Sequence, residues 1–190
     1  KESRERIGSA VKNLGAESPI RTRKKVVVNL APANIKKTGS NYDLAIAISY
    51  MLASGQMTPI ANKKIMLIGE LSLECNLKPV NSVISFTEAA QNNHFDEIIV
   101  PKENETEALL IKQNIKVVGL NNLREAIDYL EGNFNYQEPN IDVQNLLQQT
   151  RDQENIEIDF SQIKGQESAK RALIIAAAGG HNILMVGSPG

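Results

Sequence analysis

The residues most suggestive of chemistry close the 190-residue sequence, where the apolar run 183–186 leads into Gly187, Ser188, Pro189 and Gly190. Glycines at this spacing let backbone N–H groups approach phosphate oxygens, and a helix after such a loop directs its N-terminus at the anion. Gly187 fits the first glycine of a phosphate-binding loop, and Pro189-Gly190 fits its middle. The Lys-Ser/Thr pair that completes the motif would follow about three residues after Gly190. Taken alone, the same residues are also typical of an ordinary β-turn.

The elements that must position this loop are predicted from apolar periodicity and from glycine and proline stops. Apolar residues at helical spacing predict helices over 3–14, 43–54, 82–92, 103–113, 122–130 and 166–178. Runs rich in apolar and β-branched residues predict strands over 25–30, 64–69, 97–100, 115–119 and 182–186. Residues 71–80 alternate well enough for a hairpin arm or a further strand. From Ser82 onward helices and strands alternate with short loops, which favours parallel strands and crossover helices. The sequence therefore predicts an α/β (α+β) fold.

Composition changes twice along the chain, and this predicts three parts. Residues 1–132 carry the alternating elements of a folded domain. Residues 133–157 are rich in Asn, Gln, Asp and Glu with few apolar positions, which is typical of a polar acidic linker; a short helix over 143–149 is an option within it. Residues 158–190 begin a second domain. Because the chain starts with Lys1, already within a predicted helix, we expect both ends to be cut from a longer protein.

Charge is unevenly distributed although the net charge of the whole chain is only −1. Residues 1–37 hold ten basic and three acidic residues, a net charge of +7, whereas residues 134–162 have a net charge of −5. This asymmetry permits a basic face, although a solvated helix with lysines beside a strand also fits it. The candidates for sequence-independent DNA phosphate contacts are Arg4, Arg6, Arg21, Arg23, Lys24 and Lys25.

Several classes of site and location are disfavoured by composition. One cysteine, Cys75, excludes an internal disulfide framework and fits a reducing compartment. The only histidines, His94 and His181, do not make a convincing metal site with it, so no metal ligands are predicted. Aromatic residues make up only 4% of the chain, which argues against a surface that stacks many bases. The longest apolar stretch, 172–178, falls far short of the ~20 residues of a membrane span.

Residues 159–190 resemble the opening of an AAA+ ATPase module of the magnesium chelatase type. The matching features are an Asp-Phe pair, a Gly-Gln pair, a helix, a Gly-Gly-His-Asn turn and the apolar run before Gly187. The stretches 1–15, 26–57 and 67–80 resemble the N-terminal region of the YifB/ComM family of magnesium chelatase-like bacterial proteins. That domain is similar to the Lon protease domain and to the second domain of ribosomal protein S5, and its first strands normally precede the segment that begins with Lys1.

The resemblance implies a bacterial cytoplasmic ATPase that uses ATP and Mg²⁺, assembles into a hexameric ring, and remodels branched or single-stranded DNA in transformation and recombination. It places Ile163 and Gly165 at a turn that borders adenine, beside the partial phosphate loop. Two interpretations of Lys170 and Arg171 remain equally open. Their side chains contact nucleotide or a neighbouring subunit, or they lie on a solvated face of the helix. This chain alone is expected to be inactive as an ATPase, because the Walker lysine, the Walker B acids and an arginine finger supply most phosphoryl-transfer stabilisation.

A Lon-like peptidase is the main alternative, together with a protein-interaction domain of a chaperone-like ATPase. Lon peptidases share a catalytic Ser-Lys dyad. In this sequence Asn41 occupies the position of the serine, and the helix positions 84–86, where the resemblance places the lysine, contain no lysine. A displaced dyad of Ser40 with Lys37 or Lys78 would need a lysine of lowered pKa within hydrogen-bond reach. The simpler interpretation is that Ser40 or Asn41 caps the helix that begins near Asp43. No catalytic residue is predicted.

Overall fold

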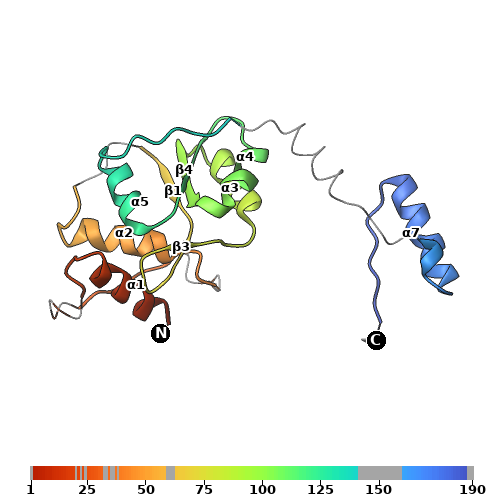
Figure 1. The fold of residues 1–190 in the computed structure, drawn as a ribbon, viewed down its shortest axis with the longest axis horizontal. Helices are drawn as coiled ribbons and strands as arrows, with labels where there is room; N and C mark the ends of the chain where they lie inside the picture. Colours follow the sequence, from red (N-terminus) through yellow and green to blue (C-terminus); the bar gives the residue numbers. More distant parts are fainter. Residues whose placement is uncertain are drawn as a thin grey trace. The chain divides into compact units, whose positions relative to one another are not determined.

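The computed structural model describes residues 2–19, 21, 23, 25–31, 34, 37, 39–58, 63–140 and 160–187. The chain divides into two compact units, Lys1–Ile141 and Asp142–Gly190, each considered by itself (Figure 1). Unit 1 contains helices on both faces of a parallel sheet, and unit 2 contains one long helix followed by an extended segment. The mixed α/β class expected from the sequence is confirmed. The predicted helix over 143–149 lies outside the described residues.

A three-stranded parallel sheet forms the centre of unit 1, with strand order β1-β4-β5. Its strands are β1 (Ile65–Leu67), β4 (Glu97–Pro101) and β5 (Lys116–Leu120). Parallel strands need crossover connections, and the helices between these strands supply them. Two shorter strands, β2 (Glu70–Leu71) and β3 (Leu77–Lys78), form a separate antiparallel pair, as expected for a hairpin within 71–80.

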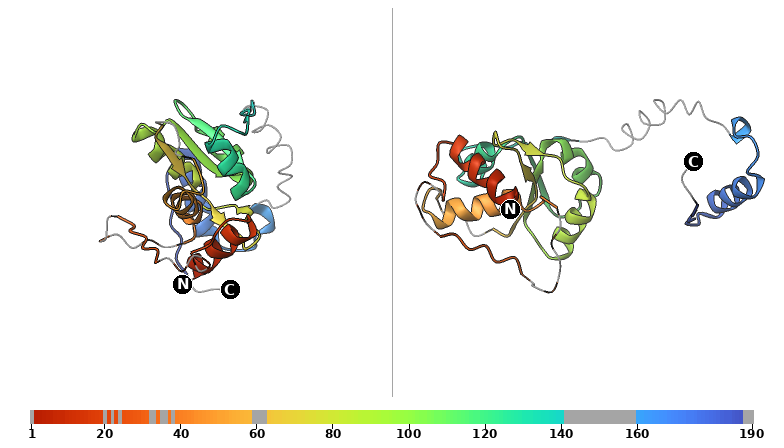
Figure 2. Two further views of the ribbon diagram at one scale, coloured as in Figure 1. Left: turned by 90° about the vertical axis from the view of Figure 1, so that its left-hand side faces the viewer. Right: turned by 90° about the horizontal axis from the view of Figure 1, so that it is seen from below.

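Alternate residues of the sheet enter two different hydrophobic clusters, which explains why β4 is buried throughout. Ile99 packs in one cluster with residues of α1 (Glu2–Asn13), α2 (Asp43–Ala53) and α5 (Leu123–Leu130). Ile98 and Val100 pack in the other cluster. That second cluster draws on α3 (Val83–Asn92) and α4 (Glu105–Leu110), which follows the 3₁₀ turn η1 (Lys102–Asn104). Figure 1 and the right-hand view of Figure 2 show these two groups of helices on opposite sides of the sheet.

Most predicted helices are confirmed, but two of the predicted caps are wrong. Tyr42, and not Ser40 or Asn41, is the N-cap of α2, and no side chain caps the helix. Ser82 precedes α3 with φ +67°, so its hydroxyl does not accept a capping bond. Asn122, in contrast, accepts a hydrogen bond from the Glu125 amide at 2.9 Å and caps α5. A cap requires a particular backbone geometry as well as a suitable residue type.

Two predicted strands, 25–30 and 182–186, are absent from the sheets of the described residues. Val27 is 78% exposed and Val186 is 90% exposed, so the apolar side chains of these segments are not packed in the core. Residues 25–30 line a groove of about 550 Å³ together with Ile46 and other residues of α2. β-propensity describes a fit to neighbouring strands, so an apolar run without a paired neighbour does not become a strand.

Candidate functional site

The polar turn and helix of unit 2 form the frame of the predicted nucleotide site. The 3₁₀ turn η2 (Phe160–Gln162) precedes α7 (Glu167–Gly179). Two residues in the left-handed region, Gly165 with φ +72° and Gln166 with φ +58°, turn the chain into the helix. The predicted helix over 166–178 is therefore confirmed with a shift of one residue at each end.

The Gly-Gly-His turn at the end of α7 sends the chain back along the helix. Gly180, with φ +62°, is the C-cap, and the His181 amide donates to the Ala176 carbonyl at 2.8 Å. The His181 ring folds over Gly179 so closely that a Cβ there would lie 2.5 Å from the ring. The geometry explains both glycines and gives His181 a structural place in the turn.

A hollow of about 440 Å³ lies between α7, the turn before it and the returning segment. Its walls include the apolar side chains of Ile163, Leu173 and Val186, and its lining also includes Gly187 and Lys170. A Cβ added to Gly187 would have no atom within 4 Å, so this position is open on the side facing away from the backbone. The hollow is shallow, because Val186 and Met185 in its lining are 90% and 63% exposed.

The structure places the predicted nucleotide-site residues in three groups. Ile163 and Gly187, which are far apart in the sequence, both line the hollow. Gly165 lies in the turn before α7, where it adopts a left-handed backbone conformation, and it does not line the hollow. Ser188, Pro189 and Gly190 lie outside the described residues.

Lys170 is the residue of this region whose role the sequence left open. Its side chain is only 16% exposed and its Nζ lies 3.3 Å from Glu167 Oε1. The Glu167 side chain is 82% exposed, so this ion pair contributes little to stability. The Lys170 ammonium therefore lines the hollow and forms only a weak ion pair. Helical periodicity in the sequence does not reveal this position.

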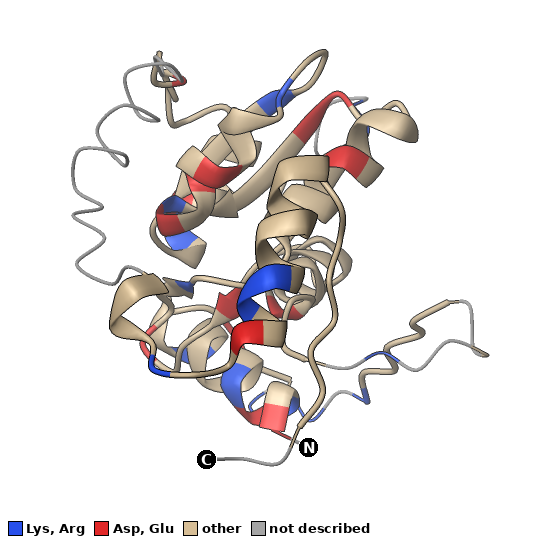
Figure 3. Cartoon of the chain, turned by 90° about the vertical axis from the view of Figure 1, so that its right-hand side faces the viewer, with Lys and Arg blue, Asp and Glu red and all other residues tan. Residues whose placement is uncertain are grey.

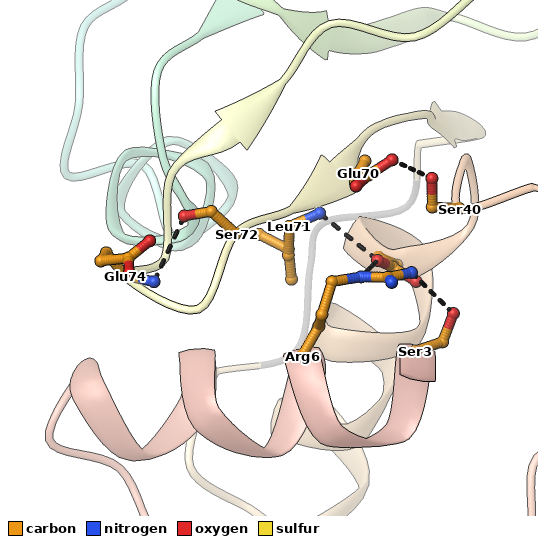
Figure 4. Close-up of polar contacts among 8 residues, drawn as sticks. Ser3, Arg6, Ser40, Glu70, Leu71, Ser72 and Glu74 are labelled. Atoms are coloured by element: carbon orange, nitrogen blue, oxygen red, sulfur yellow. Dashed lines mark hydrogen bonds and ion pairs between the residues drawn. The ribbon is translucent and has the colours of Figure 1, made fainter. Parts of the chain in front are cut away.

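The predicted DNA-contact residues of unit 1 differ in availability. Arg4, Arg21, Arg23 and Lys25 are exposed, and Lys24 lies outside the described residues. Figure 3 shows acidic bands beside the basic ones on α1, in agreement with its acidic first turn. Arg6 points inward from α1 and pairs with a carboxylate, as Figure 4 shows, so it is not free for a phosphate.

Arg6 joins three elements through a polar cluster at the start of α2. Its Nε donates to Asp43 Oδ2 at 2.8 Å and its Nη2 donates to Ser3 Oγ at 3.0 Å. The Asp43 side chain is only 1% exposed and also lies 3.5 Å from the Leu71 amide. The hydrogen bond to Asp43 raises the pKa of Arg6 despite the opposing effect of burial. Sequence reasoning missed this pair because its members are separated by the whole segment between α1 and α2.

The cluster also bears on the peptidase alternative. The Ser40 hydroxyl donates to Glu70 on β2, so its proton is engaged with a carboxylate (Figure 4). Asn41, at the nucleophile position, offers an amide and no hydroxyl. Lys78 is exposed on β3, where it faces Glu70 in the strand register. Ser40 thus donates to Glu70 and Lys78 faces the same residue, an arrangement that differs from a dyad of Ser40 with Lys78.

Metal binding and thiol reactivity can be judged for the residues that the structure describes. Among the described residues, no group of three or more His, Cys, Asp or Glu side chains could hold a metal ion. Cys75 is buried, its Sγ donates to the Ala10 carbonyl at 2.9 Å, and burial raises its pKa. Within the described part of the chain, no helix combines the length and the apolar character that crossing a membrane requires.

Comparison with known proteins gives two family matches and several relatives that align with the whole of this chain. Residues 1–104 match the family "Subunit ChlI of Mg-chelatase", and residues 159–190 match "Magnesium chelatase, subunit ChlI". The chain is 40% identical over 193 residues to YifB of Escherichia coli strain K12 and 36% identical over 198 residues to the competence protein ComM of Haemophilus influenzae. All of this chain is covered in both matches, but it spans only 35% and 36% of the two relatives. The chain belongs to the YifB/ComM family of magnesium chelatase-like proteins.

Proposed function

We propose that this chain is part of an AAA+ ATPase that binds ATP with Mg²⁺, assembles into a ring and remodels DNA. Unit 2 would contribute to the nucleotide site, and unit 1 would contact DNA through its exposed cations. The hollow between α7 and the segment that ends at Gly187 is the observation that carries the proposal.

We propose that the hollow receives the base of a nucleotide. Ile163, Leu173 and Val186 offer apolar walls for a flat ring, and Lys170 brings a positive charge into the same lining. Gly187 leaves space for a close approach of the backbone to a phosphate. Bound ATP would supply the phosphoryl group for transfer to water. Among the described residues no group of His, Cys, Asp or Glu side chains could hold a metal ion, so the proposal assigns no Mg²⁺ ligand to them.

DNA is the proposed partner of unit 1 because its free cations can act on phosphates without reading sequence. Arg4, Arg21, Arg23 and Lys25 are exposed, and they belong to the part of the chain with the largest positive charge. The likeness to a protein named for competence supports a role with DNA.

The deciding experiment measures ATP hydrolysis by the longer protein with and without branched DNA. Strong stimulation by branched DNA is expected of a motor that acts on recombination intermediates. ATP turnover that ignores DNA would contradict DNA remodelling and favour a chelatase-like or chaperone-like ATPase whose N-terminal domain binds protein.

A second measurement tests the DNA surface of unit 1 separately. Arg21→Ala should weaken DNA binding and lower the slope of log affinity against log salt by about 1, the value for one lost phosphate contact. Lys78→Ala removes one exposed charge from β3 and serves as the matched control. Equal salt slopes for both variants and the unmodified protein would remove residues 21–25 from the proposed interface.

A further inference from the structure

Strand β5 forms one edge of the parallel sheet, and an open edge offers unpaired N–H groups to any passing strand. Successive amides of a strand point alternately to its two sides. The Lys116 amide donates to the Asp96 carbonyl on the β4 side at 3.1 Å. The amides of Val117 and Gly119 therefore point away from β4, along the outer edge.

Carboxylates close this outer edge in place of a strand. Glu138 Oε2 accepts from the Val117 amide and Glu105 Oε1 accepts from the Gly119 amide, both at 3.2 Å. Just beyond the strand, Glu125 Oε2 accepts from the Asn121 amide at 2.8 Å. The three acceptors meet every second residue from 117 to 121, which is the repeat of the outward-facing amides. We call Glu138, Glu105 and Glu125 the carboxylate seal.

Each carboxylate of the seal is held by further polar partners. Lys102 lies 2.5 Å from Glu105, and the Tyr136 hydroxyl also donates to Glu105. Lys112 pairs with Glu138. Glu105 is 4% exposed, so its charge is compensated within the fold and not by bulk water.

The three glutamates of the carboxylate seal belong to different parts of the structure. Glu105 belongs to α4 and Glu125 belongs to α5, whereas Glu138 lies in the irregular segment that follows α5. Tyr136 lies in the same segment, and its ring meets the Tyr129 ring edge-on with centroids 6.1 Å apart. The Phe134 amide donates to the Asp128 carbonyl of α5 at 3.1 Å, and after this backbone contact the segment is attached at the β5 edge through the side chains of Tyr136 and Glu138.

We propose that residues 134–138 form a strap that closes the β5 edge and can open it without unfolding the sheet. When the strap is displaced, Glu138 leaves the Val117 amide while Glu105 and Glu125 stay on their helices. The edge then opens at one end only.

Amide hydrogen exchange, measured residue by residue on the full chain by NMR, tests the strap. Glu138→Ala should accelerate exchange at Val117 by about ten- to hundredfold, the equivalent of one lost hydrogen bond to a charged group. Exchange at Gly119 and Asn121 should stay close to that of the unmodified chain. Glu138→Gln keeps an acceptor oxygen and should restore part of the protection, and Tyr136→Phe should give a smaller acceleration at Val117.

Glu88→Ala, on the exposed face of α3, is the control and should leave Val117 unchanged. The proposal is overturned if Glu138→Ala leaves exchange at Val117 as it was. It is also overturned if exchange accelerates equally at Val117 and throughout β4, because the contact would then stabilise the whole sheet and not a separable strap.

Discussion

Gly119 lies so close to the Glu105 side chain that replacing it with alanine tests how tightly the β5 edge is built. A Cβ at Gly119 would lie 2.5 Å from Glu105 Oε1, 2.6 Å from its Cδ and 2.7 Å from its Cβ. Rotation of the carboxylate relieves the first two contacts but not the third, since the Cβ is attached to the backbone of α4. Gly119→Ala must therefore move Glu105, α4 or β5.

Three contributions set the expected magnitude. Overpacking of a filled site costs about 1–3 kcal/mol. A displaced Glu105 loses its hydrogen bond from the Gly119 amide, which as a bond to a charged group is worth about 1.5–3 kcal/mol. Alanine recovers about 0.4–1 kcal/mol by restricting the unfolded chain. We expect a net loss of about 2–5 kcal/mol in the free energy of unfolding, a large part of the ~5–15 kcal/mol typical of folded domains.

Urea unfolding followed by circular dichroism measures this loss, and Gly8→Ala is the matched control. Gly8 lies inside α1 with no atom within 4 Å of an added Cβ, so the same substitution should stabilise the chain by about 0.5–1 kcal/mol. In a Glu105→Gly background, which removes the Glu105 Cβ together with the carboxylate, Gly119→Ala should lose most of its cost because the obstruction is gone. A loss below about 1 kcal/mol, or an undiminished loss in that background, would refute the reasoning.

Two further predictions concern the buried polar groups of unit 1. Arg6→Ala leaves the buried Asp43 carboxylate unpaired and should lower the free energy of unfolding by about 3 kcal/mol, whereas exposed Arg4→Ala should change it by less than ~0.5 kcal/mol; equal values would contradict the proposed burial of Asp43. Burial and hydrogen bonds to Glu97 and Glu105 raise the pKa values of Tyr129 and Tyr136 above the ordinary value. A tyrosine whose pKa is raised in the folded state contributes stability that is fully present below the unfolded pKa of ~10 and is lost at higher pH. The free energy of unfolding should therefore begin to fall above pH ~10. In the double variant Tyr129→Phe, Tyr136→Phe this fall should be less steep. Phenolate absorbance in which all tyrosines ionise together near pH ~10 would contradict this.

Local patterns predicted those elements whose burial depends on their own periodicity. The helices at α1, α2, α3, α5 and α7 and the parallel pairing of β4 and β5 agree with the expectation from apolar spacing and short loops. The strands expected at 25–30 and 182–186 were wrong for a reason that no single segment reveals. A strand exists only with a hydrogen-bonded neighbour, and neither segment has one among the described residues.

Contacts between distant residues set the limit for the candidate sites. Sequence reasoning assigned Arg6 to a DNA surface, because it cannot show that α1 packs beside the start of α2 and brings Arg6 to Asp43. It also assigned no role to Glu105, whose importance depends on its contact with Gly119. In unit 2 the resemblance named Ile163 and Gly187 together, while the partial exposure and weak pairing of Lys170 required the three-dimensional arrangement.

The edge-on pair of Tyr129 and Tyr136 also gives the protein a built-in optical reporter. The sequence has four tyrosines and no tryptophan, so ultraviolet emission comes from phenol rings alone. Tyr136 donates to Glu105 and Tyr129 donates to Glu97, and a carboxylate that accepts the hydroxyl proton quenches an excited phenol. We therefore expect weak emission from Tyr136, whose acceptor Glu105 lies at the β5 edge, and from Tyr129, whose acceptor Glu97 lies on β4. Brightening of this emission would follow the state of that edge in real time, with no label attached.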